Sequence, residues 1–331
     1  MKKLLFTTGG LLLVLQMSLC ISPFTKKENQ KEIFYADPTI FYDNETYYLT
    51  GTQNSRPLGF IMLESKDLFS WKTSSIPNIP EHMILKKGDN IYGEQGFWAP
   101  QILNKNNIYY LTYTANEQIC LATSDLINGK YTQKEIKPID DTEKNIDSYI
   151  FEDSDGKFYL YHVRFNKGNF LWVAELDLKT GKIKQETLKE CFKNTQPWEA
   201  TPAYKSDPIM EGPTVIKMDG IYYMFYSANH FQSLDYAVGY ATAKSPYGPW
   251  EKYAENPIIH RSIVKENGSG HGDIFFDAKN RPYYVYHVHY SDSVVSPRKT
   301  RIVPLDFKIN HETKIYDISV KADEIIIPVT D

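Results

Sequence analysis

Five stretches of this chain open on side chains that could perform acid–base chemistry or bind a sugar. Three carry a carboxyl group at or near their start, at Asp37, Asp147 and Glu211, and the other two carry Trp98-Ala99-Pro100 and His271-Gly272 there. One carboxyl group can protonate a leaving oxygen while a second activates water, which is the pair that cleavage of a sugar acetal needs. A third negative group nearby would raise the pKa of the acid by charge repulsion. These residues predict a glycoside-cleaving site if the fold brings them together.

Each of these residues, taken alone, has an ordinary structural explanation. Asp37 stands before Pro38, and Asp before Pro is a common turn starter. Asp147 is suited to bonding backbone amides at a strand end, and Glu211 to a polar loop. Trp98 is suited to filling a core, although its flat face could also carry a sugar ring. Only the recurrence of the five stretches favours the functional interpretation.

The five stretches form an internal repeat. Each has a polar or Pro-containing entry, a short apolar run, a turn cluster rich in Asn, Asp or Gly, and an aromatic pair. Such alternating runs around turn residues predict a β-hairpin. The stretches are YADPTIFYDNETYYLTGT from Tyr35, FWAPQILNKNNIYYLTYT from Phe97, IDSYIFEDSDGKFYLYHV from Ile146, EGPTVIKMDGIYYMFYSA from Glu211 and GHGDIFFDAKNRPYYVYHV from Gly270.

The spacing of the repeat predicts an all-β, five-bladed β-propeller. The hairpins recur at roughly 50 to 65 residues, which is the size of a four-stranded blade. The first strand of each blade would line a central channel, so the five repeat starts would converge there. A β-sandwich has equally short strands but does not explain fivefold recurrence. We expect residues 33–36 to lie near the C-terminal strands and close the ring.

Composition sets limits on the class of protein. The 331 residues carry 37 basic and 41 acidic side chains, for a net charge of −4, and 42% are apolar. These values exclude disordered and fibrous classes and, with no clustered cationic run, argue against a nucleic-acid partner. The 25 Tyr, 17 Phe and 5 Trp suit both sheet cores and sugar faces.

The N-terminal segment reads as an export signal. Lys2 and Lys3 precede an apolar stretch from Leu4 to Leu15, and the small residues Ser18 and Cys20 follow near the expected cleavage point. We therefore expect a signal peptide at residues 1–20, a tether at 21–31 and the propeller at 32–331, in a periplasmic or extracellular protein. Cys20 could carry a lipid and anchor the chain to a membrane; a soluble exported form is the alternative. Three cysteines predict no disulfide framework.

Taken together and in order, several motifs resemble glycoside hydrolase family 43. They are Ala36-Asp37-Pro38, Trp98-Ala99-Pro100, the Asp147 repeat, Glu211-Gly212-Pro213, His271-Gly272, GYATAKSPYGPW and RKTRIVPL, and they span nearly the whole mature chain. The resemblance implies a five-bladed propeller and an inverting enzyme that acts on arabinose- or xylose-containing glycans. One departure is Ser148, where many relatives carry Pro.

The resemblance also implies roles for individual residues. Asp37 corresponds to the general base, Glu211 to the general acid and Asp147 to the residue that tunes and orients the acid. Trp98 corresponds to the sugar-stacking aromatic residue and Arg301 to an arginine near the sugar that is cleaved. His271 would lie beside a calcium ion or a water cluster in the channel. No organic cofactor is implied.

Two further sets of residues are candidates around this site. His287 and His289 alternate on one predicted strand and could join His271 at a metal, but they lack the ligands and supporting shell of a zinc site. Substrate specificity would depend on rim loops, with candidates at Arg164, Phe165, His230 and Phe231. Phe231 and Ala99 are expected to contact the substrate.

We therefore expect a hydrolase that cleaves arabinofuranosyl or xylosyl linkages of plant-type glycans. A single displacement with inversion requires the carboxyl groups of Asp37 and Glu211 to be roughly 6.5 to 9.5 Å apart, whereas about 5 Å would indicate retention. A related hydrolase of galactan or fructan, and a non-catalytic glycan-binding propeller, remain alternatives. The sequence does not determine whether the enzyme cleaves at chain ends or within the chain, nor its oligomeric state.

Overall fold

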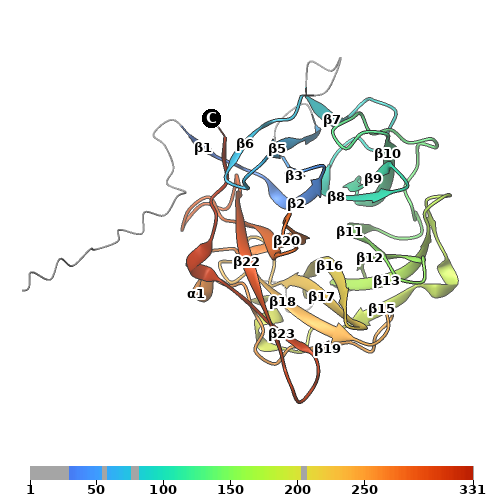
Figure 1. Ribbon diagram of the computed structural model, residues 1–331. Helices are drawn as coiled ribbons and strands as arrows, with labels where there is room; N and C mark the ends of the chain where they lie inside the picture. The colour runs from blue at the N-terminus through green and yellow to red at the C-terminus, as the bar shows by residue number, and fades with distance from the viewer. Residues whose placement is uncertain (1–29, 54–57, 76–81, 203–206, 331) are drawn as a thin grey trace, which may run out of the picture.

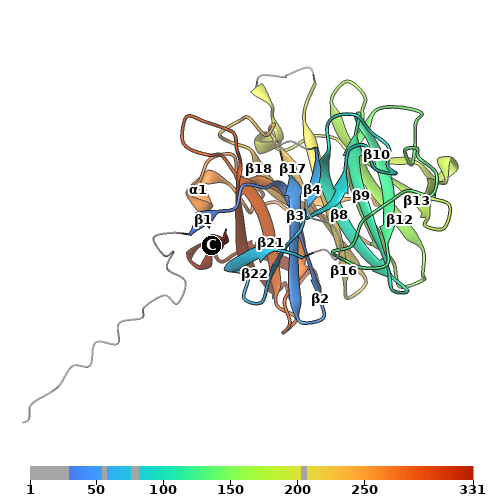
Figure 2. The same ribbon diagram turned by 90° about the horizontal axis from the view of Figure 1, so that it is seen from above.

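Five β-sheets surround a central axis in the computed structural model of the chain (Figure 1). The structure describes residues 30–53, 58–75, 82–202 and 207–330. Strands β2, β8, β11, β16 and β20 are the first strands of the five sheets and lie nearest the axis, while Figure 2 shows the strands running between the two faces of the ring. The prediction of a five-bladed propeller is confirmed.

The first two blades are built as follows. Blade 1 has the strand order β1-β24-β6-β5-β3-β2, and blade 2 has the order β10-β9-β8, with the pair β4 and β7 forming a small separate sheet. Their bounds are β1 Lys31–Glu32, β2 Ala36–Asp43, β3 Thr46–Thr52, β4 Gly59–Ile61, β5 Leu63–Ser65, β6 Ser70–Thr73, β7 Met83–Lys86, β8 Trp98–Lys105, β9 Ile108–Ala115, β10 Gln118–Ser124 and β24 Val329–Thr330.

Blades 3 to 5 follow in chain order. Blade 3 holds β11 to β15, blade 4 holds β16 to β19, and blade 5 holds β20 to β23. Their bounds are β11 Asn145–Glu152, β12 Phe158–Phe165, β13 Asn169–Asp177, β14 Lys182–Ile183, β15 Lys189–Phe192, β16 Met210–Met218, β17 Ile221–Ala228, β18 Ala237–Ala243, β19 Glu251–Lys252, β20 Gly270–Phe276, β21 Pro282–Val288, β22 Lys299–Ile309 and β23 Tyr316–Val320. The only α-helix within the described ranges is α1, Arg261–Val264.

The expected turn residues connect the first two strands of each blade. Asn44, Asn106, Asp219 and Asn280 all adopt left-handed backbone conformations in these turns, with φ between 45° and 58°. Asn and Asp adopt this conformation at lower cost than other residues with a side chain, which is why the turn clusters mark the hairpins in the sequence.

Apolar side chains fill the space between neighbouring sheets. Successive side chains of a strand point to opposite faces of its sheet, and both faces pack against a neighbouring blade. Tyrosines make up much of this core. Tyr161, Tyr223, Tyr226 and Tyr240 are each at most 1% exposed. The high aromatic content of the sequence therefore serves largely to pack blade against blade.

The ring closes through both ends of the described chain. β24 pairs antiparallel with β1 and parallel with β6, so a C-terminal strand completes the first sheet. The backbone N–H of Ile33 donates to the carbonyl of Pro328 at 3.3 Å, and the N–H of Thr300 donates to the carbonyl of Ile33 at 2.9 Å. The expected closure by residues 33–36 is confirmed. β1 begins at Lys31, inside the segment that we expected to be a tether.

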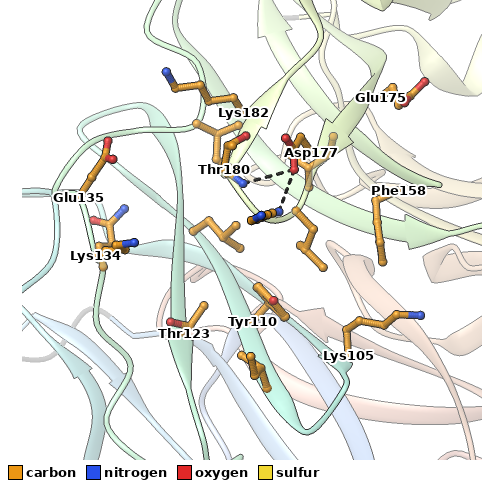
Figure 3. A pocket seen from close by; sticks show the side chains of 18 of the residues that line it. Lys105, Tyr110, Thr123, Lys134, Glu135, Phe158, Glu175, Asp177, Thr180 and Lys182 are labelled. Atoms are coloured by element: carbon orange, nitrogen blue, oxygen red, sulfur yellow. Dashed lines mark hydrogen bonds between the residues drawn. The ribbon is translucent and has the colours of Figure 1, made fainter. Parts of the chain in front are cut away.

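A large cavity of the described chain lies away from the axis. It has a volume of about 1020 Å³ and lies between blades 2 and 3, beside the hairpin turns at Asn106 and Gly156 (Figure 3). The repeat starts lie at the opposite ends of the same strands, so this cavity does not include the predicted catalytic residues. Among the described residues, no helix is long and apolar enough to cross a membrane.

Candidate active site

A bulge interrupts the first strand of every blade at the place where the repeat starts. The pairing register shifts between Ala36 and Thr39, Trp98 and Gln101, Ile146 and Tyr149, Glu211 and Thr214, and Gly270 and Gly272. The bulged residue has a positive φ each time: Asp37 47°, Ala99 45°, Asp147 54°, Gly212 61° and His271 35°. Bulges re-aim side chains and concentrate near active sites. Here the same distortion is repeated around the ring.

All five bulged residues line one small cavity at the hub. Its volume is about 20 Å³, enough for about one water molecule. Nδ1 of His271 lies 3.3 Å from Oδ1 of Asp37 and 3.7 Å from Oδ2 of Asp147. Stretches separated by more than 200 residues are thereby joined, so the predicted convergence of the repeat starts is confirmed.

Glu211 occupies a different position in the repeat from the two aspartates. Gly212 carries the positive φ in blade 4, so Glu211 corresponds to Ala36, Trp98 and Ile146 rather than to Asp37. Gly212 also lies close to His271: a Cβ atom on Gly212 would come within 2.7 Å of the imidazole Cδ2. A glycine at this bulge therefore allows the histidine to lie against the backbone beside Glu211.

Side chains of the preceding blade hold the bulges in place. The N–H of Ala99 donates to Oγ1 of Thr52 at 2.9 Å, and the N–H of Asp147 donates to Oγ1 of Thr114 at 3.2 Å. In the same way, the N–H of His271 donates to Oγ of Ser227 at 2.8 Å. Sequence reasoning missed these hydroxyl groups because each lies at the end of a second strand, where Thr and Ser are ordinary residues.

Asp37 is held in its ionised form. Burial by itself opposes ionisation, but Arg298, the imidazoles of His271 and His287, and the Thr52 hydroxyl outweigh burial and hold the pKa of Asp37 well below its usual range. Nη1 of Arg298 donates to Oδ1 at 3.1 Å, and Oγ1 of Thr52 donates to Oδ2 at 2.6 Å. A carboxylate that stays ionised is suited to act as a base.

Glu211 is held in the opposite state. Burial raises the pKa of Glu211, as does the negative charge of Asp37, and together they outweigh the opposing effects of Tyr236 and Arg298 and bring it to about 7. The hydroxyl of Tyr236 donates to Oε1 of Glu211 at 2.8 Å. A carboxyl group that is protonated near neutral pH can act as a general acid.

Asp147 shares the buried environment of Glu211. Burial raises the pKa of Asp147 well above its usual value, and the negative charges of Glu211 and Asp37 raise it further. Two buried carboxyl groups that repel each other do not ionise together readily. Asp147 and Glu211 therefore retain a proton between them at a pH where Asp37 is already ionised.

The two histidines at the hub are kept neutral. Burial lowers the pKa of His271 and lowers that of His287 well below its usual value. Nδ1 of His287 accepts the N–H of Asp37 at 3.2 Å, and its Nε2 lies 3.2 Å from Nη1 of Arg298. His289 contacts the carbonyl of Phe231 through Nε2 at 2.8 Å. His287 and His289 thus both make protein contacts in this structure.

The predicted sugar-binding residues lie in distinct surroundings. Trp98 is 36% exposed at the start of β8 and packs its ring over Gly96, so its indole is not a core filler. Ala99 is buried and lines the hub cavity. Phe231 is half-buried, with the guanidinium of Arg298 4.7 Å from the centre of its ring.

The structure corrects the expected role of Arg301. Its Nε and Nη2 atoms bind both carboxylate oxygens of Glu266 at 2.7 Å, and its Nη1 lies 3.0 Å from Oε2 of Glu32. Arg298, three residues earlier, is the arginine that contacts Asp37 and Phe231. Arg301 lies within β22, where its ion pairs tie this strand to neighbouring segments, whereas Arg298 precedes β22 and reaches the hub.

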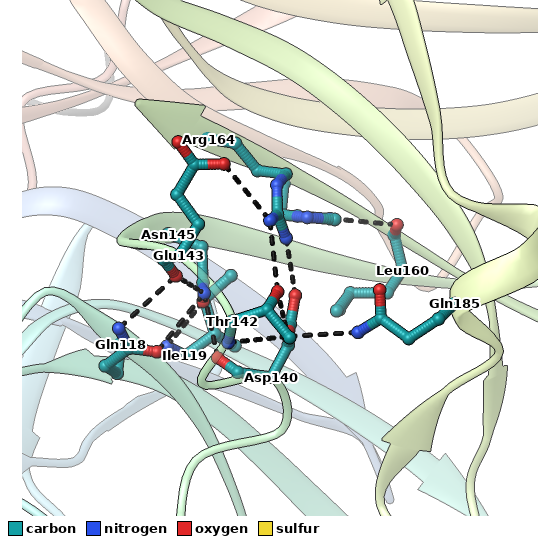
Figure 4. Close-up of polar contacts among 10 residues, drawn as sticks. Gln118, Ile119, Asp140, Thr142, Glu143, Asn145, Leu160, Arg164 and Gln185 are labelled. Carbon is teal, nitrogen blue, oxygen red and sulfur yellow. Dashed lines mark hydrogen bonds and ion pairs between the residues drawn. The ribbon is translucent and has the colours of Figure 1, made fainter. Parts of the chain in front are cut away.

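Arg164 also differs from the expectation of a rim residue. Its Nη1 donates to Oδ2 of Asp140 at 2.5 Å, and both side chains are almost fully buried. Asn145 binds the carbonyls of Asp140 and Glu143 through Nδ2, and Figure 4 shows these contacts gathered in one network. The network holds the loop that leads into β11 and to Asp147. Arg164 therefore stabilises the loop from within.

The other rim candidates remain accessible. Phe165 is partly buried, as is His230, whose ring stacks on that of Phe231 with 4.8 Å between ring centres.

The predictions for the N-terminal segment concern residues that the structure does not describe. The signal peptide, Cys20 and nearly all of the tether lie outside the described residues.

A ring of five blades whose hub pairs an ionised carboxylate with a protonated carboxyl group defines the class of propeller-type glycoside hydrolases. The family model described as "Glycosyl hydrolases family 43" matches residues 31–312, and the chain belongs to this family. The resemblance found in the motifs is thereby confirmed.

Similar proteins of known structure include two that match nearly full length. An endo-1,4-beta-xylanase from Bacteroides thetaiotaomicron has 36% identity and a TM-score of 0.82, with 92% of this chain and 99% of that chain covered. A thermostable family-43 glycoside hydrolase has 30% identity and a TM-score of 0.78, with 90% and 96% covered.

Curated relatives are more distant. The chain is 28% identical to a xylosidase/arabinosidase of Butyrivibrio fibrisolvens, with 76% of this chain and 48% of the relative covered, so it spans about half the length of that protein. It is 25% identical to a beta-D-galactofuranosidase of Aspergillus niger, with 88% of this chain and 84% of the relative covered.

Proposed function

We propose that this protein hydrolyses arabinofuranosyl or xylosyl linkages of plant-type glycans by a single displacement with inversion. One observation carries the proposal: Asp37 and Glu211 belong to one buried cluster, yet their surroundings drive their pKa values in opposite directions. An ionised base and a protonated acid are what hydrolysis of a glycosidic bond requires. The relatives named as a xylanase and as a xylosidase/arabinosidase support the choice of sugar.

The mechanism follows from these two groups. Asp37 accepts a proton from a water molecule while the water oxygen attacks the anomeric carbon. Glu211 gives its proton to the glycosidic oxygen as the carbon–oxygen bond breaks, so the leaving sugar departs as an alcohol and the configuration inverts. Asp147 and Glu211 repel each other when both are ionised, so an ionised Asp147 favours the protonated form of Glu211. Trp98 and Phe231 contact the sugar, and Arg298 holds Asp37.

A panel of aryl glycosides tests the proposal. We expect turnover of aryl arabinofuranosides or xylosides, loss of that turnover in Glu211→Ala, and a product that NMR shows first as the inverted anomer. Retained configuration would contradict the single displacement. Release of no sugar from any glycoside would instead indicate a non-catalytic glycan-binding propeller.

Product analysis on purified polysaccharides tests the sugar. We expect products from arabinan or xylan. The relative named as a beta-D-galactofuranosidase keeps a galactose-containing substrate as the second candidate. If only galactan or fructan gave products, the proposed substrate would change to that polysaccharide, and the roles of the carboxyl groups would stay the same.

We also propose one calcium ion in the channel beside His271. The described residues contain no group of three or more His, Cys, Asp or Glu side chains arranged to hold a metal, so water would supply most of the oxygen ligands that calcium needs. No step above depends on the ion. We expect one equivalent of calcium in the purified protein and a lower melting temperature in EGTA; a protein without calcium that melts identically with and without EGTA would refute the proposal.

Finally, we propose export of the protein, with a lipid anchor at Cys20 or as a soluble form. Its support is the pattern of residues 1–20. Fractionation of host cells with fatty-acid labelling tests it: wild type should leave the cytoplasm, and a label that Cys20→Ala abolishes would identify the anchored form. Retention in the cytoplasm would contradict export.

A further inference from the structure

Tyr236 connects the two catalytic carboxyl groups of the hub. It lies directly before β18 and is completely buried. Its hydroxyl donates to Oε1 of Glu211 at 2.8 Å, and its ring stacks on the imidazole of His287, with 5.7 Å between ring centres and 19° between planes. His287 in turn accepts the N–H of Asp37. The tyrosine therefore contacts the acid directly and the base through one histidine.

The ring of Tyr236 has little freedom to move. A Cβ atom on Gly270 would come within 2.2 Å of the ring, so this glycine leaves space that the aromatic ring occupies. On the other side, the imidazole of His287 is itself fully buried. The neighbouring Asp235 accepts from Nε of Arg261 at 2.6 Å. Packing of the ring between Gly270 and His287 limits the directions in which the hydroxyl can point.

The direction of the hydrogen bond determines which oxygen of Glu211 can carry its proton. Burial, with the charges of Glu211 and Asp37, raises the pKa of Tyr236 well above its usual value, so the phenol stays protonated and can donate. An oxygen that accepts a hydrogen bond from a fixed donor is the poorer site for the acidic proton of the same carboxyl group. Donation to Oε1 therefore leaves the proton to Oε2.

We propose that Tyr236 is the positioning residue of the general acid: its hydroxyl occupies Oε1 of Glu211 and so directs the acidic proton to Oε2. The inference rests on the proposed function, in which Glu211 protonates the leaving oxygen. It assigns to the segment between β17 and β18 a part in catalysis that the sequence motifs do not include. Tyr236 does not exchange a proton with the substrate; it acts through Glu211.

The test compares substrates that need the acid with substrates that do not. Dinitrophenolate leaves a dinitrophenyl glycoside without being protonated. The leaving groups of disaccharides and alkyl glycosides must be protonated as they depart. In Tyr236→Phe, we expect kcat for the second group to fall by about tenfold, the effect of one strong hydrogen bond, while kcat for dinitrophenyl glycosides changes little. Equal losses on both groups, or no loss on either, would overturn the proposal.

A matched control comes from Tyr286. This tyrosine is also fully buried, and its hydroxyl has no hydrogen-bond partner among the described residues. Tyr286→Phe removes the same atom from a neighbouring part of the core, and both groups of substrates should be turned over as in wild type. A leaving-group dependence in Tyr286→Phe equal to that in Tyr236→Phe would assign the effect to the core in general and overturn the proposal.

A second measurement requires no turnover. Loss of a donor to the carboxylate raises the pKa of the acid, so ¹³C NMR titration of Glu211 should give a higher pKa in Tyr236→Phe than in wild type. Identical pKa values would overturn the inference. If wild type releases no sugar from any glycoside, the proposed function fails, and the titration still decides whether Tyr236 controls Glu211.

Discussion

At the scale of single residues, the surroundings of each carboxyl group determine its task. Asp37 and Glu211 are equally buried, at 8% exposure each, so burial alone does not distinguish them. Asp37 has the guanidinium of Arg298 and the hydroxyl of Thr52 on its oxygens, whereas Glu211 has one phenol and a negative neighbour. Direct contact with a positive charge therefore makes one group the base, and its absence makes the other the acid.

The pH dependence of activity should reflect these states. Because the active form needs Asp37 ionised and Glu211 protonated, kcat/KM should be bell-shaped and fall above a pH of about 7, the pKa of Glu211. Asp147→Asn removes a negative neighbour, so the pKa of Glu211 should fall and the basic limb should move to lower pH. Measured profiles with identical basic limbs would contradict the tuning role of Asp147.

Arg298 should control the acidic limb of the same profile. Arg298→Met removes the positive charge next to Asp37, so the pKa of Asp37 should rise by roughly one unit or more and the acidic limb should move to higher pH. Arg301→Met provides the comparison. It should lower the free energy of unfolding by about 3 kcal/mol because it breaks a buried ion pair, without moving the acidic limb. If the acidic limb moved in Arg301→Met and not in Arg298→Met, Arg301 rather than Arg298 would be the arginine that controls Asp37.

At the scale of structural elements, blades 1, 2 and 4 each position the bulged residue of the next blade. The bulge at the start of a first strand turns a side chain toward the hub, and a hydroxyl on the second strand of the preceding blade binds the backbone N–H that the bulge exposes. The active site is therefore built from the contacts between blades rather than within one blade. A change in one sheet should alter a residue carried by its neighbour.

Thr52 tests this coupling between elements. Its hydroxyl donates to Asp37 and accepts the N–H of Ala99 in the next blade. Thr52→Val should lower the free energy of unfolding by about 1–3 kcal/mol, since it leaves two buried groups unpaired, and should raise the pKa of Asp37. Denaturant unfolding and the acidic limb measure both effects.

Thr50 is the matched control on the same strand. It is fully buried, but its hydroxyl has no hydrogen-bond partner among the described residues. Thr50→Val should therefore leave the acidic limb unchanged and preserve or raise stability. Similar losses in the two variants would show that strand packing, not the hydroxyl, is responsible.

At the scale of the whole molecule, closure of the ring keeps the blades in register around the hub. β24 lies between β1 and β6, and Val329 within it is completely buried. The first blade therefore depends on a strand that lies almost 260 residues from its neighbour β6 in the chain. Because the hub cavity has walls from all five blades, opening the ring at one seam should disturb the whole site.

Val329→Lys should open this seam. A buried charge without a partner should lower the free energy of unfolding by at least about 3 kcal/mol. It should also reduce kcat, although β24 lies in the outer part of blade 1 and not at the hub. Thermal and denaturant unfolding measure the first effect. Ile327→Lys, two residues earlier and 40% exposed, should be close to wild type; equal losses in both variants would argue against a specific role for closure.

The sequence by itself determined the hairpins, the number of blades and the three carboxyl groups at the repeat starts. These features are local: Asn, Asp and Gly mark turns because of their backbone preferences, and alternation marks strands because side chains point to opposite faces. Repetition then makes a weak local signal visible five times. The same periodicity placed Asp37, Asp147 and His271 at equivalent positions, where the structure finds them.

Only the tertiary structure decided which side chains surround those carboxyl groups. Arg298 and Arg301 are three residues apart, and β22 begins between them. Arg298 binds Asp37, whereas Arg301 binds Glu266. Thr52 and Tyr236 gain their roles from neighbours in other stretches of the chain. A pKa depends on burial and on charges within a few ångströms, and these distances join residues that the sequence keeps far apart.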